Sequence, residues 1–393
     1  MTLRAVRATD PFALTEEERA VRETVADWAR REIAPGAASR DEEERYDRGL
    51  FERAGDLGLA GLPYPEQYGG GGMGSFAWAL AMEEVAAADM GMAISLSVHV
   101  LSQLCIVANG SDEQKERFLP PMTAGRDLGA FALTEPGAGS DAAAISLAAR
   151  RDGNEYVLSG TKIWITNAGE AARYVVFGTV DRSRGRDGIT AFVVDADTPG
   201  FRLGSKERKM GIRGTTAYEL VFDDARVPVA DRLGEEGAGL KVALSALGAG
   251  RISIAAACTG LARSALELAA RYALERRQFG RAIADQEMIQ AMLAEMAVGV
   301  DAARLLTWRA ARARDAGEPI NSVSSMAKWY ASDVAMRCAT DAVQIYGGAG
   351  YSRDNAVERL MRDAKGAQIY EGTNQIHRLI VAQGLLETMR RDA

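Results

Sequence analysis

Apolar and polar residues alternate with a helical period over roughly the first 120 positions. Thr15-x-x-Glu18 matches a capping box, in which two side chains satisfy free backbone amides at a helix start. Helices are therefore expected over three stretches: residues 15–35, 75–88 and 94–108. Pro120-Pro121 is expected to close this helical region, because proline interrupts helices.

The hydrophobic period changes between about Leu128 and Val229. Short segments rich in β-branched and aromatic residues, separated by turn residues, are typical of strands. We predict strands over four stretches: residues 156–164, 174–180, 189–194 and 218–222. No helical segment intervenes, so the pattern favours an antiparallel barrel or sandwich.

The helical period returns after about Gly239 in long, alanine-rich segments. The longest cover residues 240–276, 285–316 and 320–346, which is typical of a helical bundle. We therefore predict an α+β multidomain fold with three parts: an N-terminal helical domain over residues 1–125, a middle antiparallel β-barrel over residues 126–234, and a C-terminal four-helix bundle over residues 235–393.

Composition narrows the classes of protein. The 393 residues exceed one small core, and the 47% hydrophobic and 26% charged fractions are typical of a globular protein. A net charge of −7 argues against nucleic acid as a partner. Three dispersed cysteines and two histidines give no disulfide framework and no metal site. We also expect no targeting segment, no membrane span and a cytoplasmic location.

One glycine motif matches a nucleotide-binding pattern only formally. Gly69-x-Gly71-x-x-Gly74 matches the dinucleotide-binding fingerprint. That fingerprint requires a preceding strand and a βαβ unit, and here a helical region surrounds it. We expect a loop, so that any bound flavin would not use a Rossmann fold.

Two stretches in the strand region could contact a ring. Residues 131–140, Phe-Ala-Leu-Thr-Glu-Pro-Gly-Ala-Gly-Ser, offer close backbone approach and hydroxyl donors, or else simply form a tight turn. In Lys-Ile-Trp-Ile-Thr-Asn, residues 162–167, strand alternation places Trp164 and Thr166 on one face. They could hold a flat heteroaromatic ring, although Trp164 could equally be a core residue.

Two further stretches lie in the C-terminal region. The arginines in residues 275–280, with Gln286 close behind, could cap a helix or grip a pyrophosphate. Residues 369–378 place Glu371 between apolar neighbours and a Gly-Thr turn. A carboxylate in an apolar cleft has a raised pKa and can act as a base, although Glu371 could instead be a helix-start acid.

Together and in this order, these segments resemble the acyl-CoA dehydrogenase family. The resemblance rests on Phe-x-Leu-Thr-Glu-Pro-x-Ala-Gly-Ser-Asp, Lys-x-Trp-Ile-Thr-Asn, Arg-x-x-Phe-Gly, Gln-x-x-Gly-Gly and Ile-Tyr-Glu-Gly-Thr. It extends from about Leu14 to Leu386 and includes the domain order helical, β-barrel, helical bundle. It implies a flavoprotein oxidoreductase with the acyl-CoA dehydrogenase fold and FAD as cofactor, active in fatty acid β-oxidation.

The resemblance also implies the cofactor contacts. Thr134 would bond the pyrimidine side of the flavin, Trp164 would cover the ring, and Thr166 would lie near flavin N5. Arg276, Gln278 and Phe279 match a segment that reaches the FAD of a neighbouring subunit, which implies a homotetramer, a dimer of dimers. The full set of FAD positions is Phe131, Leu133, Thr134, Gly139, Ser140, Trp164, Ile165, Thr166, Arg276, Gln278, Phe279, Gln286, Gln344, Ile345, Gly347, Gly348, Thr373 and Gln375.

The implied reaction is α,β-dehydrogenation of an acyl-CoA to a trans-2-enoyl-CoA. Glu371 would remove the α-proton while a β-hydride passes to flavin N5, and electron-transfer flavoprotein would accept the electrons. The Glu371 backbone N–H and a ribityl hydroxyl would stabilise the charge that develops on the thioester carbonyl. The substrate positions implied are Ser140, Arg251, Tyr370, Glu371 and Gly372.

Departures from the family pattern keep alternatives open. Some branches carry the base just before the position of Arg251, where this chain has Gly250, so Glu371 is expected to be the base. The chain has Gly248 and Gln383 where relatives often place an acid and a cation that contact CoA. The substrate class that the resemblance implies is short- to medium-chain acyl-CoA, with a branched acyl chain and a pantetheinyl carrier protein as alternatives. Two other classes stay open: a flavin oxidase or monooxygenase, and a non-catalytic flavin-binding assembly protein.

Overall fold

The computed structural model describes residues 12–392. Its N-terminal part is helical, as predicted. The helices are α1 (Glu16–Trp28), α2 (Ala37–Glu42), α3 (Arg48–Asp56), α4 (Gly74–Ala88), α5 (Met90–Asn109) and α6 (Asp112–Thr123). The capping box is confirmed, since Thr15 Oγ1 accepts the Glu18 N–H at 3.2 Å and Glu18 Oε2 accepts the Thr15 N–H at 2.9 Å.

The prediction that Pro120-Pro121 closes the helical region is wrong in detail. Both prolines lie inside α6, which continues to Thr123. Phe118, Leu119 and Met122 are fully buried around them. Burial of these apolar side chains offsets the hydrogen bonds that proline cannot make. The glycine motif after residue 69 does lie in a loop, directly before α4, as expected.

The middle part is a sheet of eight strands. These are β1 (Gly129–Ala132), β2 (Ala148–Asp152), β3 (Glu155–Thr166), β4 (Arg173–Thr179), β5 (Ile189–Asp195), β6 (Phe201–Lys206), β7 (Ala217–Pro228) and β8 (Arg232–Leu233). Their order is β6-β7-β3-β2-β4-β5-β8, with β1 paired to β4. The four predicted strands correspond to β3, β4, β5 and β7.

The prediction of a purely antiparallel barrel was wrong in one respect. Strand β1 pairs with β4 in parallel, and β2 also meets β4 in parallel at Ala148 and Thr179. Parallel neighbours need a long connection, and the hairpin of β2 and β3 supplies it between β1 and β4. The sheet is therefore mixed, although all its other pairings are antiparallel.

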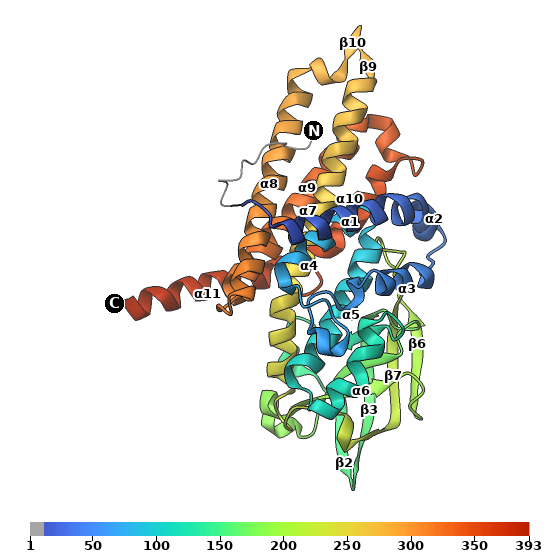
Figure 1. Ribbon diagram of the computed structural model, residues 1–393, viewed down its shortest axis with the longest axis vertical. Helices are drawn as coiled ribbons and strands as arrows, with labels where there is room; N and C mark the ends of the chain where they lie inside the picture. Colours follow the sequence, from blue (N-terminus) through green and yellow to red (C-terminus); the bar gives the residue numbers. More distant parts are fainter. Residues whose placement is uncertain (1–11, 393) are drawn as a thin grey trace.

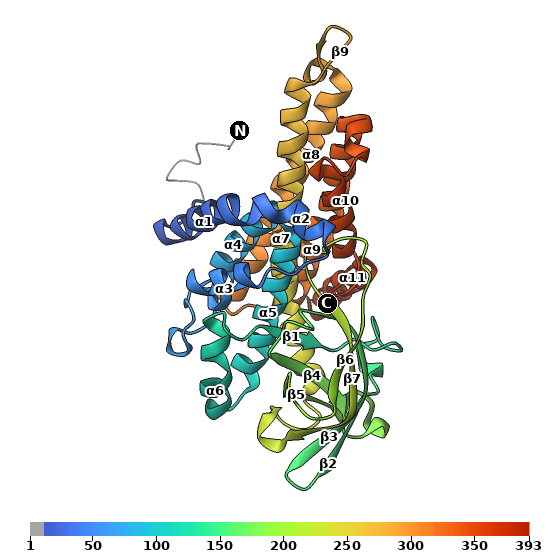
Figure 2. The same cartoon turned by 90° about the vertical axis from the view of Figure 1, so that its right-hand side faces the viewer.

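The C-terminal part is a helical bundle around one long helix. Its helices are α7 (Gly239–Glu275), α8 (Glu287–Asp315), α9 (Asn321–Tyr346), α10 (Ala356–Ala367) and α11 (Asn374–Asp392), and a small hairpin of β9 (Arg277–Gln278) and β10 (Arg281–Ala282) follows α7. Helix α7 packs against α4, α5, α8, α9 and α10. In Figures 1 and 2 the sheet lies at one end of an elongated molecule and the hairpin at the other. The domain boundaries after residues 125 and 234 stay a proposal.

Two helices, α5 and α7, are long and apolar enough to cross a membrane by length and composition alone. The prediction of no membrane span overlooked the uncharged run in α5. Most of both helices is buried inside the fold, which is typical of core helices of a globular protein.

Candidate active site

The site brings together Glu371 and Gly250, which lie far apart in sequence. Gly250 belongs to α7, and Glu371 lies in the loop between α10 and α11. A methyl carbon placed on Gly250 would lie 2.4 Å from Glu371 Oε2 and 3.2 Å from Leu101 Cδ1. The carboxyl group therefore lies directly over a position without a side chain, with an apolar side chain of α5 beside it.

The surroundings of Glu371 suit a base. Its Oε2 is buried and has no hydrogen-bond partner among the described residues. Burial raises the pKa of Glu371 to about 7, while the charges of Lys328 and Arg251 act in the opposite direction. A carboxyl group with this pKa is available both as carboxylate and as acid near neutral pH.

The backbone at Glu371 is in an unusual conformation. Glu371 has a φ of 52° and Gly372 a φ of 93°, so two consecutive residues are left-handed. A left-handed residue other than glycine costs about 1–2 kcal/mol, which surrounding contacts must offset. Contacts with neighbouring groups must therefore hold the loop in this conformation.

Replacing Gly250 by alanine tests the contact with Glu371. The added methyl would meet the end of a flexible side chain, so we expect the protein to fold and the carboxyl group to move. A displacement of about 1 Å can cost about 100-fold in rate, and we expect at least a tenfold loss of flavin reduction by acyl-CoA. Gly248→Ala is the matched control, since only Ile320 Cδ1, at 3.9 Å, would lie near its methyl. Equal rates in the two variants would contradict the placement.

Of the other predicted substrate residues, Arg251 follows Gly250 on α7, and Tyr370 and Gly372 adjoin Glu371 in the chain. Arg251 is buried, and its Nη1 donates to Asn321 Oδ1 at 2.7 Å and to Ser325 Oγ at 3.0 Å on α9. Tyr370 has a buried hydroxyl without a partner among the described residues. Ser140 is exposed on the loop after β1. A direct contact of Arg251 with substrate stays a prediction, because its guanidinium already bonds α9.

Trp164 and Thr166 flank the buried Ile165 at the end of β3. The register with β7 shifts between Lys162 and Ile165, so a β-bulge interrupts the alternation that the sequence predicted. Trp164 has a φ of 59° and is 53% exposed, which is high for an indole. It is therefore not a core residue, whereas Ile165 can offer only its backbone to a ligand.

A buried ion pair that the sequence reasoning missed holds the 131–140 segment. Lys162 Nζ donates to Glu135 Oε1 at 2.7 Å and to the Leu133 carbonyl at 3.0 Å, and Lys162 is 0% exposed. Glu135 also accepts the backbone N–H groups of Ser146 and Leu147. The pair ties residues beside Phe131 and Thr134 to the strand that carries Trp164.

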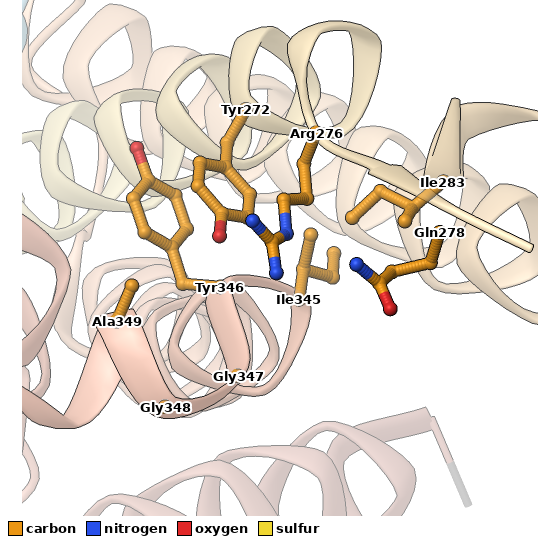
Figure 3. Close-up of a pocket in the computed structure, with 9 residues that line it drawn as sticks. All are labelled: Tyr272, Arg276, Gln278, Ile283, Ile345, Tyr346, Gly347, Gly348 and Ala349. Carbon is orange, nitrogen blue, oxygen red and sulfur yellow. The ribbon is translucent and has the colours of Figure 1, made fainter. Parts of the chain in front are cut away.

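A second site lies at the far end of the bundle (Figure 3). It is a pocket of about 380 Å³ between the end of α7 and the end of α9. Tyr272 and Tyr346 stack there with ring centroids 4.0 Å apart, and neither was predicted. The predicted residues that line it are Arg276, Gln278, Ile345, Gly347 and Gly348. Aromatic residues next to Arg and Gly motifs could have indicated this pocket.

The remaining predicted FAD positions lie outside this pocket. Phe279 is 95% exposed at the hairpin tip, and Gln286 accepts a hydrogen bond from Arg281 at 2.8 Å. Gln344 and Gln375 are exposed, and Thr373 is half-buried at the start of α11. Leu133 is buried and Gly139 exposed. None of these lines the pocket of Figure 3.

The two sites cannot be one site within this chain. Arg276 follows Gly250 by 26 positions (276 − 250) along and just past α7. At 1.5 Å per residue this places Arg276 about 39 Å from the base. Glu371 and the pocket at Arg276 are therefore two separate sites within this chain.

Both sites have features that fit FAD. The exposed indole of Trp164 is available to a flat ring. Arg276 forms no ion pair with any described residue, and its guanidinium points toward Gly347 in Figure 3. Methyl carbons on Gly347 and Gly348 would meet open space, so their backbone is accessible to a phosphate.

Comparison with known proteins gives matches across the chain. Three domain models of the acyl-CoA dehydrogenase family match it: the N-terminal domain over residues 15–126, the middle domain over residues 130–225 and the C-terminal domain over residues 237–386. An acyl-CoA dehydrogenase of Bacillus subtilis is 46% identical, covering 95% of this chain and 99% of the relative. The short-chain specific acyl-CoA dehydrogenase of Bos taurus mitochondria is 43% identical, covering 96% and 92%.

Two solved structures are also similar. One is a chain from a structure described as the electron transferring flavoprotein of Acidaminococcus fermentans, in connection with flavin-based electron bifurcation. Its TM-score is 0.94 and its identity 44%, and the match covers 95% of this chain and 99% of that chain. The other is butyryl-CoA dehydrogenase of Megasphaera elsdenii, with a TM-score of 0.94, 43% identity and the same coverage. The chain belongs to the acyl-CoA dehydrogenase family of FAD-dependent enzymes, and FAD is its cofactor.

Proposed function

We propose that this enzyme dehydrogenates short- to medium-chain acyl-CoA thioesters to trans-2-enoyl-CoA, with Glu371 as the base. The observation that carries the proposal is the buried Glu371 Oε2, which has no hydrogen-bond partner among the described residues and lies directly over Gly250. The similarity to short-chain specific and butyryl-CoA dehydrogenases supports the short end of this range. A branched acyl chain stays an alternative.

Each residue of the site has its own role in the proposed reaction. Glu371 removes the α-proton, and its backbone N–H stabilises negative charge on the thioester carbonyl. Leu101 keeps water away from the carboxyl group, which sustains the raised pKa of Glu371. Bound FAD supplies the hydride acceptor at N5. Trp164 and Thr166 hold the ring, and residues 131–140 bond its polar edge.

The separation of the two FAD-binding sites favours a shared cofactor. Because the two sites are separate within one chain, the Arg276 pocket would receive the cofactor held by Trp164 of another copy. We propose the homotetramer, a dimer of dimers, as the assembly that brings them together. The proposed cytoplasmic location stays a prediction.

Replacing Arg276 by glutamine is expected to weaken FAD retention by about tenfold. The guanidinium would be lost from a pocket where it has no carboxylate partner among the described residues, and a charge-assisted bond to a phosphate contributes about 1.5–3 kcal/mol. FAD content after dilution and gel filtration measures the effect. Arg277→Gln is the matched control, since Arg277 donates only to the exposed Gly280 carbonyl. Equal loss in both variants would contradict the proposed contact.

The proposed electron acceptor is electron-transfer flavoprotein. Its support is the similarity to the chain from the Acidaminococcus fermentans work. A direct assay compares electron transfer from the substrate-reduced enzyme to electron-transfer flavoprotein with transfer to oxygen. Substantial peroxide formation would instead favour the oxidase or monooxygenase alternative.

A substrate screen tests the proposed function. Anaerobic flavin bleaching should be fastest with one of the thioesters from butyryl-CoA to octanoyl-CoA, and slower with C16 acyl-CoA. Branched short acyl-CoAs belong in the same series, and acyl groups on a pantetheinyl carrier protein test the alternative carrier. Absence of bleaching by every thioester, with FAD bound, would favour the non-catalytic alternative.

A further inference from the structure

The strained loop that carries Glu371 is attached to three residues of helix α9. Lys328 and Ser332 lie four residues apart on α9 and share a face, and Asp333 follows Ser332. Lys328 Nζ donates to the Gly372 carbonyl at 2.7 Å and to Asn374 Oδ1 at 3.2 Å. Lys328 is 0% exposed, so an ammonium group has been taken out of water at this position.

Ser332 and Asp333 of α9 bind the ends of the loop. Asn374 Nδ2 donates to Ser332 Oγ at 2.9 Å and to Asp333 Oδ1 at 2.8 Å. Gln368 Nε2 donates to the same Asp333 oxygen at 2.7 Å. The loop between Gln368 and Asn374 is thus closed on α9 at its beginning and its end, with Lys328 bonded to its centre.

The opposite side of the turn is packed by His377. A methyl carbon on Gly372 would lie 3.1 Å from His377 Nε2, a tight contact, and the φ of 93° also favours glycine here. His377 is buried, and burial lowers its pKa to about 3, so the ring is neutral. The turn is therefore held between a neutral ring and a cation.

We propose that Lys328 is a positioning residue, which holds the left-handed turn at Glu371 and Gly372 and supplies a positive charge beside the base. The proposal rests on the proposed role of Glu371 as the base. The geometry that supports it is the 2.7 Å hydrogen bond from Lys328 Nζ to the Gly372 carbonyl. The bond also gives a reason for burying a lysine here, since a buried ammonium group without partners costs free energy.

Three neighbours of Glu371 hold no charge near neutral pH. Burial raises the pKa of the Cys258 thiol to about 12 and raises that of Tyr370, and it keeps His377 neutral. The titratable and charged groups around the base are Arg251 and Cys258 on α7, Lys328 and Asp333 on α9, His377 on α11, and the adjacent Tyr370. Burial lowers the pKa of Lys328 to about 8, so it stays mostly charged at pH 7. Arg251 and Lys328 are then the cations that favour the carboxylate.

The test compares Lys328→Met with Lys328→Gln in the holoenzyme. Methionine removes both charge and donor, whereas glutamine removes the charge and keeps a donor. The titration of the Glu371 carboxyl group is followed by infrared difference spectroscopy against the same backgrounds carrying Glu371→Gln. We expect both variants to titrate at least about one pH unit higher, which lowers the carboxylate fraction at pH 7 about fivefold. If Lys328→Met does not fold, Lys328→Gln carries the titration test.

A second readout addresses the turn itself. Amide exchange of the 368–376 segment should be faster in Lys328→Met than in Lys241→Met, a control at an exposed lysine of α7. In the kinetics, kcat for flavin reduction should fall with little change in KM. Wild-type titration and wild-type exchange in Lys328→Met would overturn the proposal. The titration requires no substrate, so failure of the proposed function, tested by Glu371→Gln, is seen separately.

Discussion

Replacing Glu371 by glutamine is expected to slow flavin reduction by acyl-CoA by at least about 10²–10⁴-fold, because the amide cannot accept the α-proton. Glutamine keeps the volume of the side chain, so the contact with Leu101 and the space over Gly250 are preserved. The amide is also neutral, as a group in this buried place prefers. FAD content and acyl-CoA binding should therefore stay close to wild type, and the loss should lie in kcat.

The control for this prediction is Glu387→Gln. Glu387 is an exposed carboxylate on α11, and its replacement by glutamine changes the net charge by the same amount. Stopped-flow absorbance of the flavin under anaerobic conditions measures the rate of both variants. A similar loss in Glu387→Gln would show that net charge, not the position of the carboxyl group, controls the rate.

Replacing Lys162 by methionine is expected to destabilise the protein by about 3–5 kcal/mol, because a buried carboxylate would lose its cation. Burial acts to raise the pKa of Glu135, yet Lys162 and the backbone donors of Leu147 and Ser146 hold it below its ordinary value. Without Lys162, Glu135 must stay charged and unpaired or take up a proton. Either outcome disfavours the folded state at neutral pH.

The effect of Lys162→Met should extend to the cofactor. Lys162 also donates to the Leu133 carbonyl, so the 131–140 segment beside the proposed flavin ring loses an anchor. We expect a lower urea midpoint by tryptophan fluorescence and weaker FAD retention. Lys206→Met is the control, since Lys206 is exposed and bonds only the Glu44 carbonyl. The double variant Glu135→Gln/Lys162→Met should regain part of the stability. An unchanged midpoint in Lys162→Met would contradict the proposed role of the pair.

Strong periodic signals in the sequence predicted most of the fold. The long helices α7, α8 and α9 and the apolar strands β3, β4 and β5 lie where the periods placed them, within a few residues. Strand β7 begins where predicted but continues to Pro228, six residues beyond its predicted end (228 − 222). Strands β2 and β6 were missed because their residues are mostly exposed and polar, which gives no alternation. The parallel pairing of β1 with β4 depends on the path of the chain in space, which local periodicity does not contain.

The candidate site was predicted as residue types, not as distances. Motifs gave Glu371 and Trp164, but the contact of Glu371 with Gly250 joins α7 to a loop more than 100 positions later. The bulge between Lys162 and Ile165 interrupts the strand pairing at Trp164, and local alternation does not predict it. Lys162 and Lys328 were overlooked, because a lysine in a sequence is expected on the surface and its burial depends on distant partners.

The most direct test of Glu371 as the base is the pH dependence of anaerobic flavin reduction by butyryl-CoA in single turnovers. Burial raises the pKa of Glu371 to about 7, and a base must be deprotonated to act. We expect the wild-type rate to rise with pH through an apparent pKa near 7 and to level off above it. Glu371→Gln should be slow and without this rise. A Glu371→Gln enzyme that keeps both the wild-type rate and the rise near pH 7 would contradict the assignment of the base.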